Sequence, residues 1–218
     1  HVRLIATSPL HLQVWGETVS SVLESDGRAR VDISLEFLNR DRKDQRFEVL
    51  YDIVGPDGDL VADGRSSEFV EGRSSGRTTR SFHIENPRLW SPASPELYTV
   101  HLHLMDRSKK LDHVRIQHGI RTAAFDPDRG FVLNGEKVLL KGVCLHHDGG
   151  LVGAAVPEGV WRRRLEILKE GGVNAIRTAH NPFSEEFLDL CDEMGFLVQH
   201  EIFDELDYAK DKRWNYHD

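Results

Sequence analysis

The stretch "VNAIRTAHNPFSEEFLDLCDEMGFLVQHE", residues 173–201, contains a short apolar strand, a polar loop, an amphipathic helix and a second apolar strand. The helix should begin after Ser184, because Glu185 and Glu186 favour the positive end of the helix dipole, and it should end at Gly195. Its predicted buried stripe consists of Phe187, Cys191 and Met194. A strand, a helix and a strand in this order indicate parallel strands joined by a right-handed crossover.

The residues before this stretch continue the same pattern. A strand is predicted over 138–143, and a helix over 158–170, where Trp161, Leu165 and Leu168 recur at helical spacing. Further upstream, Asn134-Gly135 within "GFVLNGEKVLLKGV" is suited to a type I′ turn, which indicates a β-hairpin. The order strand, helix, strand, helix, strand therefore predicts the opening of an α/β domain with a parallel sheet.

The first half of the chain, from Val2 to about Thr122, alternates apolar and polar residues in short runs separated by turn signals. In "RVDISLEFLN" and "YTVHLHL" every second residue is apolar, and no helix-period segment intervenes. This spacing predicts an antiparallel β-sandwich. His101 and His103 alternate with the apolar residues of "YTVHLHL", so we interpret them as the solvent face of a strand and not as metal ligands.

The composition limits the classes of function. The chain has 218 residues and a formal charge of −8, from 28 basic and 36 acidic residues, which argues against a nucleic-acid surface. No run of 18 apolar residues is present, so no transmembrane helix is expected. Cys144 and Cys191 are expected to be free thiols in the core, which leaves the compartment undetermined. Because the chain begins at His1 without a leader pattern, we expect an internal piece of a longer protein.

Polar side chains follow each predicted parallel strand. In such folds ligand-binding groups come from the loops after the carboxyl ends of the strands. Neither an HExxH zinc motif nor a GxSxG nucleophile elbow is present. Imidazole, amide and carboxylate groups instead suit the donors and acceptors of sugar hydroxyls, so we predict a carbohydrate site. The groups concerned are His146, His147, Asp148, His180, Asn181, His200, Glu201, Asp204 and Glu205.

The segments "LLKGVCLHHDGG", "GAAVP" and "LKEGGVNAIRTAHNPFSEEFLDLCDEMGFLVQHEIFDE" together resemble glycoside hydrolase family 2, and within it the β-galactosidases. Upstream, "RLWSPASPELYTV" and "GIRTAAFDPDRGFVLNGEKVLLKGV" also resemble that family, so the resemblance covers nearly the whole chain. It implies an immunoglobulin-like β-sandwich over 1–122, and the first three βα units of a (β/α)8 TIM barrel over 123–218. A full barrel takes about 250 residues, so this barrel would be incomplete.

The resemblance also implies roles for individual residues. His146 and His180 would bind the sugar, with Asn181 and Asp148 at the border of the subsite. Arg177 would orient the nucleophilic carboxylate, Glu201 would support it, and Glu205 would be a magnesium ligand; no other cofactor is implied. Structural alternatives remain open: Arg177 as an internal ion-pair partner, the two histidines as core residues, and Asn181 as part of a turn.

The implied function is that of a retaining exo-β-glycosidase acting on terminal β-galactosides. The enzymatic alternative is a β-glucuronidase or β-mannosidase of the same family. The non-enzymatic alternative is a non-catalytic carbohydrate-binding or scaffold module. The family's acid/base glutamate follows an asparagine, and no Asn-Glu pair occurs here. Both catalytic glutamates are therefore expected beyond residue 218, and the chain alone should be inactive. The open edge of its sheet should self-associate or pair with the rest of the barrel.

Overall fold

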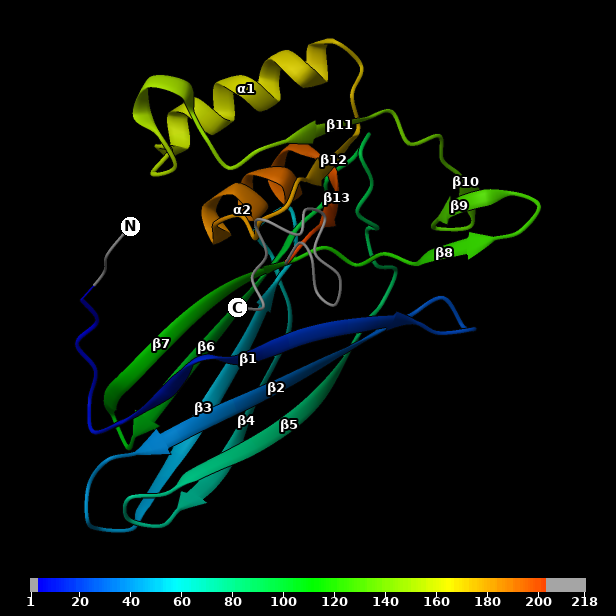
Figure 1. The fold of residues 1–218 in the computed structure, drawn as a ribbon. Coiled ribbons are helices and arrows are strands. Elements are labelled where there is room, and N and C mark those ends of the chain that lie inside the picture. Colours follow the sequence, from blue (N-terminus) through cyan, green and yellow to red (C-terminus); the bar gives the residue numbers. More distant parts are fainter. Residues whose placement is uncertain (1–3, 203–218) are drawn as a thin grey trace. The chain divides into compact units, whose positions relative to one another are not determined.

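The computed structural model describes residues 4–202 (Figure 1). The chain divides into two compact units. The first, here called the β-rich unit, comprises residues 1–91, 96–126 and 132–136. The second, here called the α/β unit, comprises residues 92–95, 127–131 and 137–218.

The β-rich unit contains two antiparallel sheets (Figure 1). One sheet has the order β1-β2-β5, and the other has the order β4-β3-β6-β7. The predicted antiparallel β-sandwich is therefore confirmed, and it is consistent with an immunoglobulin-like domain. The strands are β1 (Leu10–Leu23), β2 (Ala29–Asn39), β3 (Gln45–Val54), β4 (Leu60–Val70), β5 (Ser75–Ile84), β6 (Tyr98–Asp106) and β7 (Lys109–His118).

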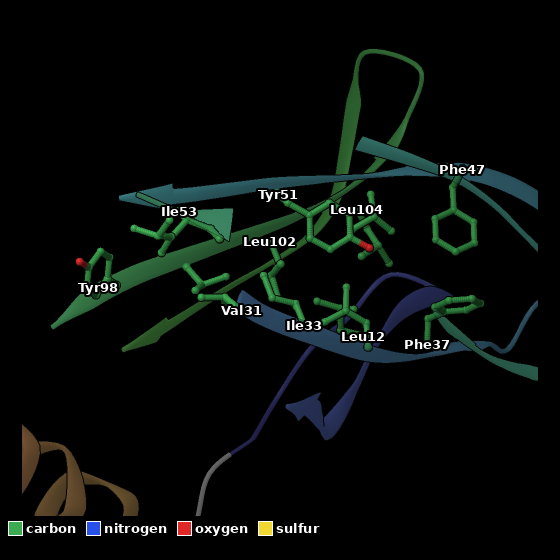
Figure 2. Close-up of a cluster of buried hydrophobic side chains, with 14 of the residues drawn as sticks. Leu12, Val31, Ile33, Phe37, Phe47, Tyr51, Ile53, Tyr98, Leu102 and Leu104 are labelled. Atoms are coloured by element: carbon green, nitrogen blue, oxygen red, sulfur yellow. The ribbon is translucent and has the colours of Figure 1, made fainter. Parts of the chain in front are cut away.

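The core of this unit lies between its two sheets. In Figure 2, Ile33 from β2 points toward Leu102 from β6, and Phe37 from β2 faces Phe47 from β3. The apolar residues of the two alternating runs are at most 2% exposed, as their period of two predicted. They are Val31, Ile33, Leu35 and Phe37 of β2, and Val100, Leu102 and Leu104 of β6.

The polar side chain of Asn39 is completely buried in this unit. Its Nδ2 donates to the carbonyls of Lys43 (2.9 Å) and Glu71 (3.0 Å), and its Oδ1 accepts from the backbone N–H of Asp41 (3.0 Å). A single amide thus satisfies three backbone groups from two loops, which holds the β2–β3 turn to the end of β4.

We expect Asn39→Ala to destabilise the β-rich unit by about 2 to 4 kcal/mol, because three backbone groups lose their hydrogen bonds to a completely buried side chain. Urea unfolding followed by circular dichroism would measure the change. Lys43→Ala is the matched control: it removes an exposed side chain but leaves the carbonyl that Asn39 binds. Equal stability of the two variants would contradict this role for Asn39.

The α/β unit contains a parallel sheet with the order β11-β12-β13 (Figure 1). Its elements in chain order are β11 (Gly142–Leu145), the 3-10 turn η1 (Gly150–Val152), α1 (Glu158–Glu170), β12 (Ala175–Thr178), α2 (Glu185–Met194) and β13 (Leu197–His200). The predicted alternation of strands and helices is confirmed over these residues. The helix of a third βα unit would follow residue 202 and lies outside the described residues.

A small sheet with the order β10-β9-β8 precedes the parallel strands. Its strands are β8 (Ala123–Asp126), β9 (Gly130–Leu133) and β10 (Glu136–Lys137). Asn134 and Gly135 connect the last two with φ angles of 51° and 82°, which confirms the predicted turn with two positive φ angles. Asn134 also donates from Nδ2 to the carbonyl of Trp90 (3.0 Å), which anchors the turn.

The first parallel strand begins at Gly142, so the prediction of a strand from 138 was wrong. The side chain of Asn174 explains the difference: its Oδ1 accepts from the Lys141 N–H (2.8 Å), and its Nδ2 donates to the carbonyl of Leu139 (3.0 Å). These bonds take the place of a β-ladder before Gly142. Leu139 and Leu140 are accordingly exposed, although their apolar side chains suggested a buried strand.

The helices of this unit bury most of the faces that their sequence periodicity predicted: Trp161, Leu165, Phe187 and Cys191 are buried, and Leu168 and Met194 are partly buried. Burial raises the pKa of the Cys191 thiol. Cys144 was predicted to be buried as well, but it is exposed. The reason is strand alternation: its neighbours on β11, Val143 and Leu145, pack on the helix side, so the thiol points to the opposite face.

Among residues 4–202, no helix is both long enough and apolar enough to cross a membrane.

Candidate functional site

The three parallel strands end at the same edge of the sheet. Leu145 of β11 pairs in register with Thr178 of β12, which pairs with His200 of β13. The residues that follow therefore leave the sheet side by side, and the hydrogen bond from the Ala179 N–H to the Leu145 carbonyl (2.8 Å) extends this register by one position. This edge is where parallel α/β folds place their ligand-binding groups.

The structure brings the two predicted sugar-binding histidines together. The ring centroids of His146 and His180 lie 5.3 Å apart, with 47° between the ring planes. His146 is exposed and His180 is partly buried. His180 has a φ of +70°, an unusual backbone conformation for a residue other than glycine. Such strain persists only where neighbouring groups impose it, and it is common at functional sites.

Glu201 imposes that conformation. Its Oε2 accepts from the backbone N–H of His180 (2.7 Å), and its Oε1 accepts from Nε and Nη2 of Arg177 (both 2.6 Å). Its own N–H donates to Oγ1 of Thr178 (2.9 Å). One carboxylate thus joins the ends of β12 and β13 and fixes the turn that carries His180.

These bonds stabilise the ionised form of Glu201. The N–H of His180, followed by the guanidinium of Arg177, holds the pKa of the Glu201 carboxyl below its usual value, and Glu201 in turn raises the pKa of Arg177. A carboxyl with a lowered pKa keeps its interactions at neutral pH. They are lost only when the pH falls through the lowered pKa.

Asp148 and Asn181 lie in the loops that follow β11 and β12. Asp148 is exposed, its Oδ1 accepts from the Gly150 N–H (3.3 Å), and its carbonyl accepts from Nη1 of Arg164 (2.9 Å), so these two bonds organise its own loop. Asn181 is partly buried beside His180 in sequence.

The sequence did not predict the role of Thr178 at this edge, nor the contact that His200 makes there. The buried hydroxyl of Thr178 accepts from Glu201, and Nε2 of His200 accepts from the Phe183 N–H (3.1 Å), which leaves the other ring nitrogen of His200 to carry the proton. Nη1 of Arg177 also lies 3.7 Å from Sγ of Cys144. The available sequence signal for Thr178 was its position at the end of a predicted strand. The other contacts depend on the register of neighbouring strands.

The predicted magnesium ligand, Glu205, lies outside the described residues, as does Asp204. Between residues 4 and 202, no group of three or more histidine, cysteine, aspartate or glutamate side chains is arranged to hold a metal ion.

Comparison with known proteins covers both units. The family model "Glycosyl hydrolases family 2" matches residues 14–121, and "Glycosyl hydrolases family 2, TIM barrel domain" matches residues 127–208. A β-galactosidase from Bacteroides ovatus is 37% identical over 94% of this chain, and a putative β-glucuronidase from Formosa agariphila is 44% identical over 66%. A crystal structure of a family 2 member from Bacteroides cellulosilyticus superposes with a TM-score of 0.88 at 33% identity, over 96% of this chain.

The chain spans only part of these relatives: 24% of the Bacteroides ovatus protein, 14% of the Formosa agariphila protein and 27% of the Bacteroides cellulosilyticus chain. Two family models in the expected order, on a sandwich followed by parallel βα units, agree with the resemblance found in the sequence. The chain belongs to glycosyl hydrolase family 2.

Proposed function

We propose that this chain supplies the immunoglobulin-like domain and the first strands of the catalytic barrel of a retaining exo-β-glycosidase. The domains would be residues 1–122 and 123–218. The observation that carries the proposal is the pair His146 and His180 at the tips of adjacent parallel strands, with His180 held in a strained conformation by Glu201. Side chains fixed in this way can bind a substrate without a large cost in ordering.

The proposed substrate is a terminal β-galactoside. Imidazole nitrogens both donate to and accept from vicinal hydroxyls, and Asn181 and Asp148 would border the same subsite. A β-glucuronide carries a carboxylate, for which arginine is the usual partner. Arg177 at this edge gives two of its nitrogens to Glu201, and the mechanism proposed below assigns its remaining nitrogen to the nucleophile, which favours a neutral sugar. The glucuronidase names among the relatives make a glucuronide the second candidate.

The proposed mechanism requires two carboxyl groups, one that protonates the glycosidic oxygen and one that attacks the anomeric carbon. Glu201 does not suit either role, because its oxygens are occupied by Arg177 and the His180 N–H. We infer that both catalytic carboxyls come from parts of the enzyme outside this chain. Arg177 would orient the nucleophile, and the imidazoles of His146 and His180 would bind the sugar hydroxyls as charge develops on the ring.

This assignment is tested by comparing the 218-residue chain with the longer protein that contains it, on nitrophenyl β-galactoside, β-glucuronide and β-mannoside. We expect only the longer protein to hydrolyse a substrate, with kcat/KM for the galactoside at least about 100-fold above the others, because a site built to bind one set of hydroxyls rejects analogues that leave polar groups unpaired. Enzyme-like hydrolysis by the 218-residue chain would contradict the placement of the catalytic carboxyls. A preference for the glucuronide would replace the galactoside assignment, and no hydrolysis by the longer protein would favour a binding or scaffold role.

The proposal extends to the strands that pair with the edges of the parallel sheet. β11 and β13 form the two edges of the three-stranded parallel sheet, and parallel strands of this kind are normally paired or covered on both sides. We propose that further barrel strands pair with these edges in the longer protein, and that a second copy can do so for the chain by itself.

A further inference from the structure

Three histidines gather on the outer face of the larger sheet of the β-rich unit. His101 and His103 are two positions apart on β6, so their side chains leave the same face. His113 of β7 lies directly opposite His103 and diagonal to His101. Both cross-strand positions are within reach of a side chain as long as histidine.

The ring of His113 makes a different contact with each of the other two. It stacks against His103, with centroids 4.4 Å apart and 15° between the planes. Toward His101 the centroids are 5.6 Å apart and the planes 11° apart, while Nδ1 of His101 lies 3.4 Å from Nε2 of His113. The distance between the two ring centroids exceeds the distance between the two nitrogens by about two ring radii. This is the geometry of nearly coplanar rings whose nitrogen atoms face each other.

This N···N distance suits a shared metal ion. If both nitrogens lay about 2.0–2.1 Å from a cation, as for zinc, a separation of 3.4 Å would give an N–metal–N angle of about 112°, close to tetrahedral. Because the rings meet nearly nitrogen to nitrogen, each lone pair would have to turn by about 34° to point at that position, and neither side chain is buried, so both can rotate. Neutral imidazole is the commonest protein ligand for such ions.

We propose that His101 and His113 form a binding site for a divalent transition-metal ion, with zinc favoured by the angle and water completing its coordination. This goes beyond the proposed glycosidase function and revises the interpretation of His101 as only a solvent-facing residue. The site has two protein ligands, so it is an open surface site and not a closed cage. In the metal-free protein one ring donates to the other; on binding, that proton moves through solvent to the far nitrogen of its own ring.

Two neighbours favour the site. His103 stacks on His113 and so restricts the orientation of its ring before the metal arrives, which lowers the entropic cost of binding. Asp52 of β3 lies opposite His101 in the sheet register and adds a carboxylate to the same face. Arg115 lies opposite His101 on the other side, so the surrounding charge is mixed.

The test is titration of the 218-residue chain with zinc chloride by isothermal calorimetry at neutral pH, in a buffer that does not bind metal. Every protein carries H1A, because an amino-terminal histidine can chelate metal through its terminal amine. We expect H101A and H113A each to weaken zinc binding by at least about tenfold, since loss of even an outer-sphere partner typically costs 10–100-fold. H83A, which removes an exposed histidine of the other sheet, should leave the affinity unchanged.

Two further measurements make the outcome specific, because the chain contains 12 histidines. Zinc should raise the melting temperature of the parent but not of H101A or H113A, as expected for a ligand that binds only the folded state. NMR resonances of the His101 and His113 rings should shift first during the titration. Equal zinc affinity in H101A, H113A and H83A, or no detectable binding by the parent, would overturn the proposal. All variants should have the parent's circular dichroism spectrum without zinc, because the substitutions lie on the outer face.

Discussion

Replacement of Phe37 by alanine is expected to destabilise the β-rich unit by about 3 to 5 kcal/mol, the range for removal of a buried phenylalanine ring. Phe37 is 2% exposed and meets Phe47 edge-on, with ring centroids 4.9 Å apart (Figure 2). Its ring also lies directly over Gly76 of β5, where a Cβ atom would come 2.3 Å from Phe37 Cε2. Because Gly76 has no side chain to move into the space, the variant would keep most of the cavity.

Phe69→Ala is the matched control for Phe37→Ala. Phe69 is 47% exposed on β4 and contacts the guanidinium of Arg46, 5.2 Å from its ring centroid. Its loss should cost no more than about 1 kcal/mol, the size of an exposed cation–π contact. Urea unfolding of both variants, followed by circular dichroism, gives the comparison. Similar unfolding midpoints for the two variants would show that Phe37 is not part of a closely packed core.

Replacement of Glu201 by glutamine in the longer protein is expected to lower kcat/KM by about 100-fold, the loss that a misplacement of about 1 Å in an active site can cause. Glutamine keeps the shape of the side chain but has one oxygen in place of two. Its amide nitrogen would face either Arg177 or the His180 N–H, and both are donors. The turn that carries His180 should therefore relax from its positive φ, and the His146–His180 pair should separate.

Glu193→Gln is the control with the same chemical change. Glu193 of α2 accepts from Nη1 and Nη2 of Arg162 on α1, so its hydrogen bonds join two helices. We expect its kcat/KM to remain within about twofold of the parent, as for most exposed ion pairs. Melting curves of both variants separate loss of activity from loss of folding. Unchanged activity of Glu201→Gln in a folded protein would remove Glu201 from the positioning of His180.

Much of the fold could be predicted because its signals are local. The period of two in β2 and β6 identified which side chains would be buried, since successive residues of a strand face opposite sides. The helix predicted over 158–170 has those bounds in the structure, because its apolar stripe and the glycines after it lie within a few turns. The Asn134-Gly135 turn needs only its own two residues to adopt positive φ.

The errors have a common cause. The strand predicted from Val138 begins at Gly142 because Asn174, more than thirty residues later, binds the backbone of the preceding segment. Cys144 looks like a small core residue, but the alternation of β11 exposes it beside Arg177. In both cases the deciding groups are distant in sequence: Asn174 for the start of the strand, and the helix residues on which Val143 and Leu145 pack for the exposure of Cys144.

The sequence by itself determined the two-part organisation, the buried faces of strands and helices, and the gathering of histidines and carboxylates at the ends of three strands. Only the tertiary structure decided how those groups pair: that Glu201 joins Arg177 to the backbone of His180, and that His101 meets His113 across β6 and β7. The physical reason is that periodicity fixes the face on which a side chain lies. Its partner is fixed by strand register, which brings together residues far apart in the chain.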